Sequence, residues 1–168
     1  KGTTVTVVLP LEPVEEPAAA PQTNTPLDLN IEDTRLAGLR VLVADDNAIN
    51  RTILQAMLSG FGMETTIVSD GREAVDAWGA GKFDLVLLDI SMPGMDGMTA
   101  LGHIRDKMDQ VGGRQEPIIA ITANAMIHQV EAYLEAGFDG HLGKPIRLER
   151  LAEELARATG QRASARNP

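Results

Sequence analysis

Residues 84–97 read Asp84-Leu-Val-Leu-Leu-Asp89-Ile-Ser-Met-Pro-Gly-Met-Asp-Gly97, an apolar run that ends in an acidic residue and two turn-forming pairs. The four apolar residues Leu85 to Leu88 predict a strand that is buried on both faces. Asp89 stands where that strand should end, which is the place where open α/β sheets hold their chemistry. An aspartate that only caps a turn is the alternative interpretation. The other strand ends must decide between the two.

Strand-like and helix-like segments alternate on both sides of this stretch. Apolar or β-branched runs predict five strands, at Arg40–Ala44, Met63–Val68, Leu85–Leu88, Ile118–Ile121 and Gly140–Gly143. Each strand is followed by apolar residues at helical spacing. Strand–helix alternation over residues 39–159 predicts an α/β fold, a doubly wound parallel sheet with helices on both faces. The helical positions are Ile49, Ile53, Ala56 and Met57; Ala74, Val75 and Trp78; Met98, Leu101, Ile104 and Met108; Met126, Ile127, Val130, Tyr133 and Leu134; and Leu148, Leu151 and Leu155.

Composition and charge limit the class of protein. The chain has 168 residues, 43% of them hydrophobic and 23% charged, which suits one globular domain. A net charge of −9 argues against a nucleic-acid partner, because that partner needs a basic surface. There is no cysteine, so disulfide and thiol chemistry are excluded. The sequence has no apolar run of membrane-spanning length and no signal-peptide pattern, so we expect a cytoplasmic domain without direct membrane contact.

The chain ahead of the alternating segments has a different character. Residues 1–10 contain a β-branched, strand-like run that has nothing near it to pair with, and we interpret it as the end of another domain. Residues 11–38 are acidic and punctuated by proline, which predicts an extended linker. The domain itself is expected over residues 39–159, and residues 160–168 are expected to form a tail.

Residues that can carry chemistry end four of the five predicted strands. They are Asp45 and Asp46, Asp89, Thr122, and Lys144. Each alone could be a helix cap or a solvated charge, but the carboxyl ends of parallel strands meet at one edge of a sheet. Three close carboxylates repel one another unless a cation joins them, and oxygen ligands suit Mg²⁺. A lysine and a threonine hydroxyl beside them suit a transferred phosphoryl group, for which Asp89 would be the nucleophile.

These residues together resemble the receiver domain of two-component phosphorelays. The motifs are Asp45-Asp-Asn47, Leu87-Leu-Asp-Ile-Ser-Met-Pro-Gly-Met-Asp-Gly97, Ile121-Thr-Ala123 and Lys144-Pro145. The resemblance covers residues 39 to about 159 and implies a flavodoxin-like sheet with strand order 2-1-3-4-5. It also implies that the domain promotes its own phosphorylation and dephosphorylation.

The resemblance assigns roles at the site. Asp89 becomes the phosphoacceptor, and Mg²⁺ is held by Asp45, Asp46, Asp89 and the carbonyl of Ser91.

The resemblance also implies roles for residues around the phosphoryl group. Thr122 would contact it and act as a switch, Lys144 would be its counter-charge, and the peptide before Pro145 would be cis. His141 stands where the family often has an aromatic residue, and we expect it to couple to Thr122 as a smaller, titratable switch ring. A partly exposed strand histidine without a role is the alternative interpretation.

Two segments resemble hybrid sensor histidine kinases in particular. Asp45-Asp-Asn-Ala-Ile-Asn50-Arg51 is similar to receivers fused to such kinases, and Gly2–Pro10 looks like the last strand of their ATP-binding domain, with Val5 where an aromatic residue is usual. The implied function is phosphoryl transfer from a phosphohistidine of the kinase core in the same polypeptide to Asp89, and onward to a histidine phosphotransfer protein. A regulatory receiver that docks on its own kinase core is the alternative. A Mg²⁺-dependent hydrolase is less favoured, because Asp89-Ile-Ser91 lacks the second carboxylate of an Asp-x-Asp motif.

Overall fold

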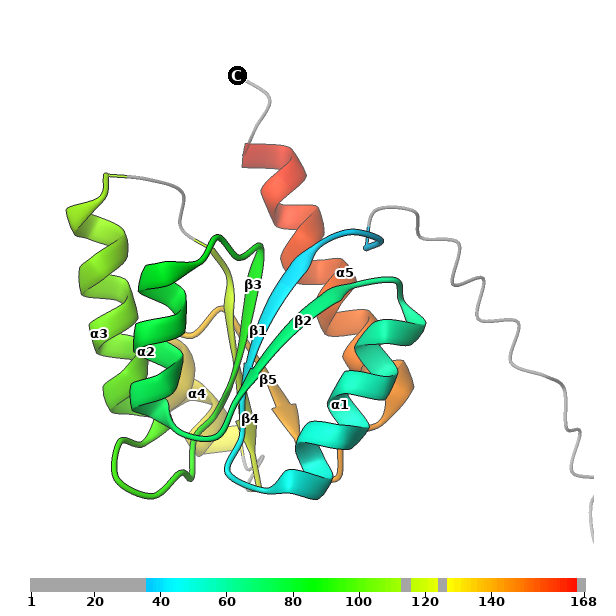
Figure 1. Cartoon of the computed structure of the whole chain (residues 1–168), viewed down its shortest axis with the longest axis horizontal. Helices are drawn as coiled ribbons and strands as arrows, with labels where there is room; N and C mark the ends of the chain where they lie inside the picture. The colour runs from blue at the N-terminus through cyan, green and yellow to red at the C-terminus, as the bar shows by residue number, and fades with distance from the viewer. Residues whose placement is uncertain (1–35, 113–115, 124–126, 166–168) are drawn as a thin grey trace, which may run out of the picture. The chain divides into compact units, whose positions relative to one another are not determined.

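The computed structural model describes residues 36–112, 116–123 and 127–165. Five strands alternate with five helices over these residues, as predicted (Figure 1). The strands are β1 (Arg40–Ala44), β2 (Glu64–Val68), β3 (Leu85–Asp89), β4 (Ile118–Thr122) and β5 (Gly140–Gly143). The helices are α1 (Ala48–Gly60), α2 (Gly71–Ala80), α3 (Gly97–Gln110), α4 (Ile127–Glu135) and α5 (Leu148–Ala165). The interpretations of residues 1–10 and of the linker up to residue 35 lie outside the described part of the chain.

All five strands are parallel and lie in the order β2-β1-β3-β4-β5, which confirms the predicted flavodoxin-like topology. The register pairs Ala44 with Leu88, Asp89 with Ile121, and Thr122 with Gly143. Neighbouring strands therefore end within a residue or two of one another. This brings the residues that follow each strand to the same edge of the sheet.

The core has two halves, one on each face of the sheet. Figure 1 shows α1 and α5 on one side of the sheet and α2 and α3 on the other. Successive residues of β3 point to opposite faces, so Leu87 packs in the cluster under α1 and α5, while Leu88 packs in the cluster under α2 and α3. Every residue of β3 and β4 is buried, as expected for central strands of a doubly wound sheet.

The buried face of α1 is not the one that the sequence pattern indicated. Leu54 and Leu58 are fully buried, whereas Ile49 and Ile53 are 69% and 42% exposed. The helix carries two apolar stripes, one with the two isoleucines and one with the two leucines, and the leucine stripe packs in the core. One apolar stripe of α1 therefore faces solvent.

Two smaller differences concern other helices. Met98 of α3 and Leu134 of α4 are 36% and 47% exposed, so neither is a core position. Helix α5 continues to Ala165, into the segment that was expected to be a tail.

The domain begins slightly earlier than expected. Leu36 is 4% exposed and packs in the cluster under α1 and α5, although it was assigned to the linker. A turn brings it there, because Gly38 has a positive φ of 77° and its N–H donates to the carbonyl of Gly62 at 2.8 Å. In the part of the chain that the structure describes, no helix has both the length and the apolar character that crossing a membrane requires.

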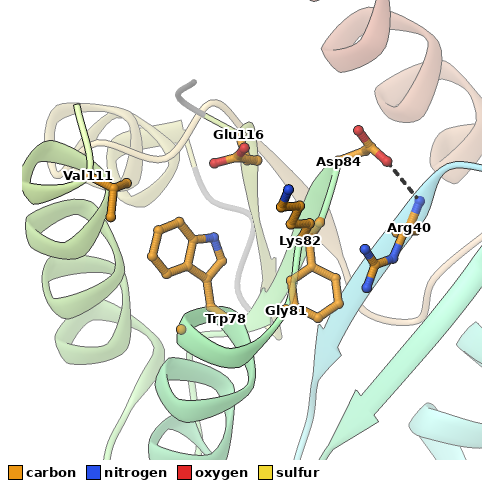
Figure 2. A pocket seen from close by; sticks show the side chains of 9 residues that line it. Arg40, Trp78, Gly81, Lys82, Asp84, Val111 and Glu116 are labelled. Carbon is orange, nitrogen blue, oxygen red and sulfur yellow. Dashed lines mark hydrogen bonds between the residues drawn. The ribbon is translucent and has the colours of Figure 1, made fainter. Parts of the chain in front are cut away.

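The amino end of the sheet carries a hollow of about 500 Å³ (Figure 2). It is lined by Arg40, Trp78, Gly79, Gly81, Lys82, Phe83, Asp84, Val111 and Glu116. The Arg40 guanidinium lies 5.6 Å from the centre of the Phe83 ring, and the Arg40 N–H donates to the Asp84 carboxylate at 3.1 Å. These contacts tie the start of β1 to the start of β3.

Candidate functional site

Three aspartates meet at the carboxyl end of the sheet. Asp45 follows β1, Asp46 comes next, and Asp89 ends β3. One carboxylate oxygen from each lies within 4.8 Å of the other two. Asp45 and Asp89 are 0% and 1% exposed, while Asp46 is open to solvent. The predicted acidic cluster therefore forms, with two buried members and one at the surface.

Lys144 lies directly against the two buried carboxylates. Its Nζ atom is 2.6 Å from Asp89 Oδ2 and 3.0 Å from Asp45 Oδ2. Its main-chain N–H donates to the Thr122 carbonyl at 2.8 Å, which fixes the end of β5 against the end of β4. The Lys144–Pro145 peptide is cis, as the resemblance implied. One ammonium group thus bridges the ends of three strands.

Burial and pairing shift the acidities of these groups. Burial raises the pKa of Asp89, and hydrogen bonds from Lys144 and from the Ser91 N–H only partly oppose that effect. For Lys144, burial favours the neutral form, but hydrogen bonds to Asp89 and Asp45 outweigh it and raise the lysine pKa. The lysine therefore remains a cation beside the carboxylates.

Residues of the first turn of α1 hold the acidic pair in place. Asn50 Nδ2 is 3.2 Å from both carboxylate oxygens of Asp45, and the Asn47 N–H donates to Asp45 Oδ1 at 2.8 Å. Arg51 Nη1 donates to the carbonyls of Asp45 and Asp46 at 2.8 and 2.9 Å. The sequence pattern gave Asn50 and Arg51 no role at the site. The helix that begins at Ala48, with Asn47 as its N-cap, brings both side chains back to the strand end.

The segment after Asp89 turns sharply into α3. The Ser91 N–H donates to Asp89 Oδ1 at 3.2 Å, so the position predicted to supply a carbonyl ligand lies beside the carboxylate of the predicted phosphoacceptor. A Cβ atom at Gly97 would collide with the Asp89 carbonyl oxygen. Glycine is therefore required at position 97 by lack of space.

Thr122 ends β4 and is 3% exposed. Its Oγ1 atom lies 3.2 Å from the hydroxyl of Tyr133 in α4. His141 is half-buried in β5, where it lines a hollow of about 370 Å³ with Lys144, Pro145 and Arg147 among others. Tyr133 was expected only as an apolar helix position, and its hydroxyl is the feature that sequence reasoning missed.

The donor set fits Mg²⁺. All candidate ligands are oxygens, and Mg²⁺ takes one or two carboxylates and fills its remaining positions with water and phosphate oxygens. Asp46 leaves one side of the cluster open to solvent, which is where those waters and a phosphate would enter. Lys144 offsets only one of the three acidic charges, so a divalent cation is electrostatically favoured here.

The sequence matches the family described as response regulator receiver domain over residues 41–156. The chain belongs to this family. Its relatives include receiver regions of hybrid sensor histidine kinases. It is 39% identical over 121 residues to the sensor histidine kinase GacS of Pseudomonas protegens, a match that covers 72% of this chain and 13% of GacS. The chain thus spans only a small part of the kinases that it resembles.

Solved receiver structures agree with the fold. The receiver domain of the sensor histidine kinase PA1611 from Pseudomonas aeruginosa is 38% identical, with a TM-score of 0.64 and 74% of this chain and 99% of that chain covered. That structure holds a magnesium ion in its active-site cleft. The receiver of Saccharomyces cerevisiae Ssk1, solved with the histidine phosphotransfer protein Ypd1, is 28% identical with a TM-score of 0.69, covering 76% of this chain and 92% of that chain.

Proposed function

We propose that this receiver domain accepts a phosphoryl group from a phosphohistidine on Asp89, with Mg²⁺ bound, and passes it to a histidine phosphotransfer protein. The receiver would be part of a hybrid sensor histidine kinase, with residues 1–10 as the end of the ATP-binding domain and the linker from residue 11 onward joining it to the receiver. One observation carries the proposal. The buried Asp89 carboxylate lies 2.6 Å from Lys144 and shares a cluster with Asp45 and Asp46.

Each residue of the site has a separate role in the phosphoryl transfer. An Asp89 oxygen attacks phosphorus, the P–N bond to the histidine breaks, and the nitrogen keeps the electron pair of that bond. Lys144 neutralises charge on the phosphoryl oxygens, and the Thr122 hydroxyl donates a hydrogen bond to one of them. Asp45, Asp46 and the Ser91 carbonyl would hold Mg²⁺, which supplies positive charge to the transferring group when bound.

The exposed stripe of α1 supports a protein partner at this site. Ile49 and Ile53 lie on the helix that begins just after Asp45 and Asp46, and both side chains face solvent. Apolar side chains beside a charged site suit an interface with an apolar centre. The related Ssk1 receiver has been solved with a phosphotransfer protein, which is the kind of partner proposed here.

The decisive experiment is labelling with acetyl phosphate. We expect Mg²⁺-dependent phosphorylation of the wild type and none in Asp89→Asn. The variant should stay folded, because it removes a buried carboxylate whose charge burial disfavours. Undiminished labelling of Asp89→Asn would overturn the assignment.

Transfer from a phosphorylated histidine phosphotransfer domain tests the partner separately. The variant Ile53→Asp should slow this transfer about tenfold or more, since it places a charge in the proposed interface, and should leave acetyl phosphate labelling unchanged. Equal transfer by both proteins would argue against docking on α1. If no transfer occurs but deletion of residues 39–168 changes the activity of the kinase core, the receiver acts by docking on its own kinase instead.

A further inference from the structure

Asn50, in the first turn of α1, holds the carboxylate of Asp45 at both of its oxygens. Its Nδ2 atom lies 3.2 Å from Asp45 Oδ1 and 3.2 Å from Asp45 Oδ2. Oδ1 also accepts a hydrogen bond from the Asn47 N–H at 2.8 Å, and Oδ2 lies 3.0 Å from Lys144 Nζ. Three donor groups therefore surround one carboxylate that is fully shielded from solvent.

These contacts leave Asp45 little capacity to bind a cation directly. An ionised carboxylate has about four lone-pair positions, and each Asp45 oxygen already has two donors. A metal ion can therefore bind Asp45 directly only if one of these donors moves away. The Asn50 amide is the donor that can leave most easily, because it is neutral and its two contacts are the longest of the set.

Mg²⁺ and Ca²⁺ differ in how many such ligands they take. Mg²⁺ is bound through one or two carboxylates and keeps several waters, whereas Ca²⁺ takes about six to eight oxygens in a flexible arrangement. Selectivity between the two ions depends on the number and the mobility of the ligands. Asp46 and Asp89 already supply two carboxylates to the cluster. A third carboxylate, free to bind directly, would therefore favour Ca²⁺ more than Mg²⁺.

We propose that Asn50 makes the site selective for Mg²⁺ over Ca²⁺, because it holds both oxygens of Asp45 and so withholds a third direct carboxylate ligand. Asn50 is then a positioning residue, which acts on the metal through Asp45. The inference deepens the proposed function and rests on it, since it requires Mg²⁺ to bind at the acidic cluster.

The proposal predicts a change in selectivity of definite sign. Asn50→Ala removes the amide and leaves a good helix former in α1. Ca²⁺ then no longer has to break the contact between Asn50 and Asp45, whereas Mg²⁺ leaves that contact intact and gains nothing. A hydrogen bond of ordinary net strength corresponds to roughly a threefold to tenfold change in an equilibrium constant. The ratio of the Ca²⁺ affinity to the Mg²⁺ affinity should therefore rise by about that factor.

The test is a pair of titrations of the full chain, one with MgCl₂ and one with CaCl₂, followed by calorimetry and by the amide chemical shifts of residues 45–50. We expect the affinity ratio to rise in Asn50→Ala, through tighter binding of Ca²⁺. Asn50→Ser ends one atom before the position of the amide nitrogen, so the same rise is expected. It serves as the second variant if Asn50→Ala does not fold.

Leu58→Val is the matched control. Leu58 is fully buried at the far end of the same helix, so this variant weakens the packing of α1 without touching the acidic cluster. It should leave the ratio of the two affinities unchanged. Urea unfolding without metal checks that each variant is folded and ranks their stabilities.

Two results would overturn the inference and leave the proposed function intact. One is a rise in the affinity ratio of less than about threefold in Asn50→Ala, which includes an equal loss of both affinities, as a purely structural role would give. The other is the same rise in Leu58→Val, which would mean that loosening α1 is enough. If the wild type fails to bind Mg²⁺, or if Asp46→Ala binds it as tightly as the wild type, the metal site of the proposed function is itself wrong.

Discussion

The two ends of the same sheet differ in what they bring together. At the carboxyl end, the Lys144 ammonium group lies 2.6 Å from the Asp89 carboxylate and 3.0 Å from the Asp45 carboxylate. These three residues come from the ends of three different strands. At the amino end, Trp78, Lys82 and Val111 surround a hollow of about 500 Å³, and Figure 2 shows their side chains spread around its rim. This hollow and the candidate chemistry thus lie at opposite ends of the sheet.

Burial explains why only one end suits phosphoryl chemistry. Asp45 and Asp89 are almost fully shielded from water, so their charges interact strongly with Lys144 and with any cation that binds. At the other end, Val111 is 70% exposed and Lys82 is open to solvent, so water screens the charges there. Buried charged side chains that meet at one place indicate a site of this kind. The volume of a surface hollow does not.

The largest effect is expected from a matched pair of lysine substitutions, one at each end of the sheet. Lys144→Ala should slow labelling by acetyl phosphate about 100-fold, because one preorganised charge at the transferring group is lost. Lys82→Ala should leave the rate unchanged. Initial rates with radiolabelled donor measure both. A similar loss in the two variants would erase the distinction between the two ends.

A pair of aspartate substitutions compares metal binding at the two ends. Asp46→Ala should weaken Mg²⁺ binding at least about tenfold, since Asp46 is the exposed member of the cluster and is expected to hold the metal more directly than Asp45. It should also stabilise the metal-free fold slightly by relieving repulsion between carboxylates. Asp84→Asn, which alters a carboxylate bonded to the Arg40 N–H, should leave Mg²⁺ affinity unchanged. A calorimetric titration that matches the wild type for Asp46→Ala would contradict this role.

A smaller effect concerns the cap that starts α3 beside the site. Asp96 accepts a hydrogen bond from the Thr99 N–H at 2.8 Å, and that bond lowers the pKa of its carboxyl group below the ordinary value of 3.8. Asp96→Ala should therefore cost about 1 kcal/mol of stability at pH 7. Because the folded pKa is the lower one, this contribution is present above pH 3.8 and is lost as the pH falls through the folded value.

Urea unfolding of the wild type and of Asp96→Ala at pH 7 and pH 3 measures that difference. The gap between the two proteins should shrink at the lower pH. Asp96→Asn keeps the acceptor oxygen without the charge, so it should lose less stability than Asp96→Ala at pH 7 and show little pH dependence. A gap that stayed constant with pH would mean that the carboxylate charge plays no part in the cap.

The smallest expected effect comes from the chain that leads to the amino end. Deletion of residues 1–35 should leave the melting temperature within a few degrees, because an acidic, proline-punctuated linker contributes little burial. By contrast, Leu36→Ala in the shortened chain should cost about 2 to 4 kcal/mol, since Leu36 is a core residue. A large loss on deletion alone would indicate that the N-terminal segment packs on the domain.

Much of this architecture could be predicted from local sequence patterns. The strand Arg40–Ala44 was predicted residue for residue, and a run of apolar residues followed by Asp89 predicted both a central strand and the site at its end. These predictions succeed because strand burial and parallel topology depend on local pattern and a general rule about sheet edges. The meeting of Lys144 with Asp45 and Asp89 follows from the same rule.

Features that depend on how a helix rotates or packs could not be predicted in this way. The sequence of α1 offers both Ile49 with Ile53 and Leu54 with Leu58, and only the fit against the sheet decides between them. On α5, Arg150 pairs with Glu153 and Arg157 with Glu154, each at i,i+3, and the side-chain rotamers decide which neighbour each arginine contacts. The contact between Thr122 and Tyr133 likewise depends on where α4 lies, which no local pattern encodes.

The lack of space at Gly97 limits which substitutions this position can accept during evolution. A side chain at this position would have to displace the main chain of Asp89, so any substitution there moves the proposed phosphoacceptor itself. Gly94 is a glycine for another reason, a φ of 79°, and has open space around it. Asparagine can adopt that conformation at modest cost, so position 94 can vary across descendants of this chain. Position 97 cannot vary unless the connection from β3 to α3 is rebuilt at the same time.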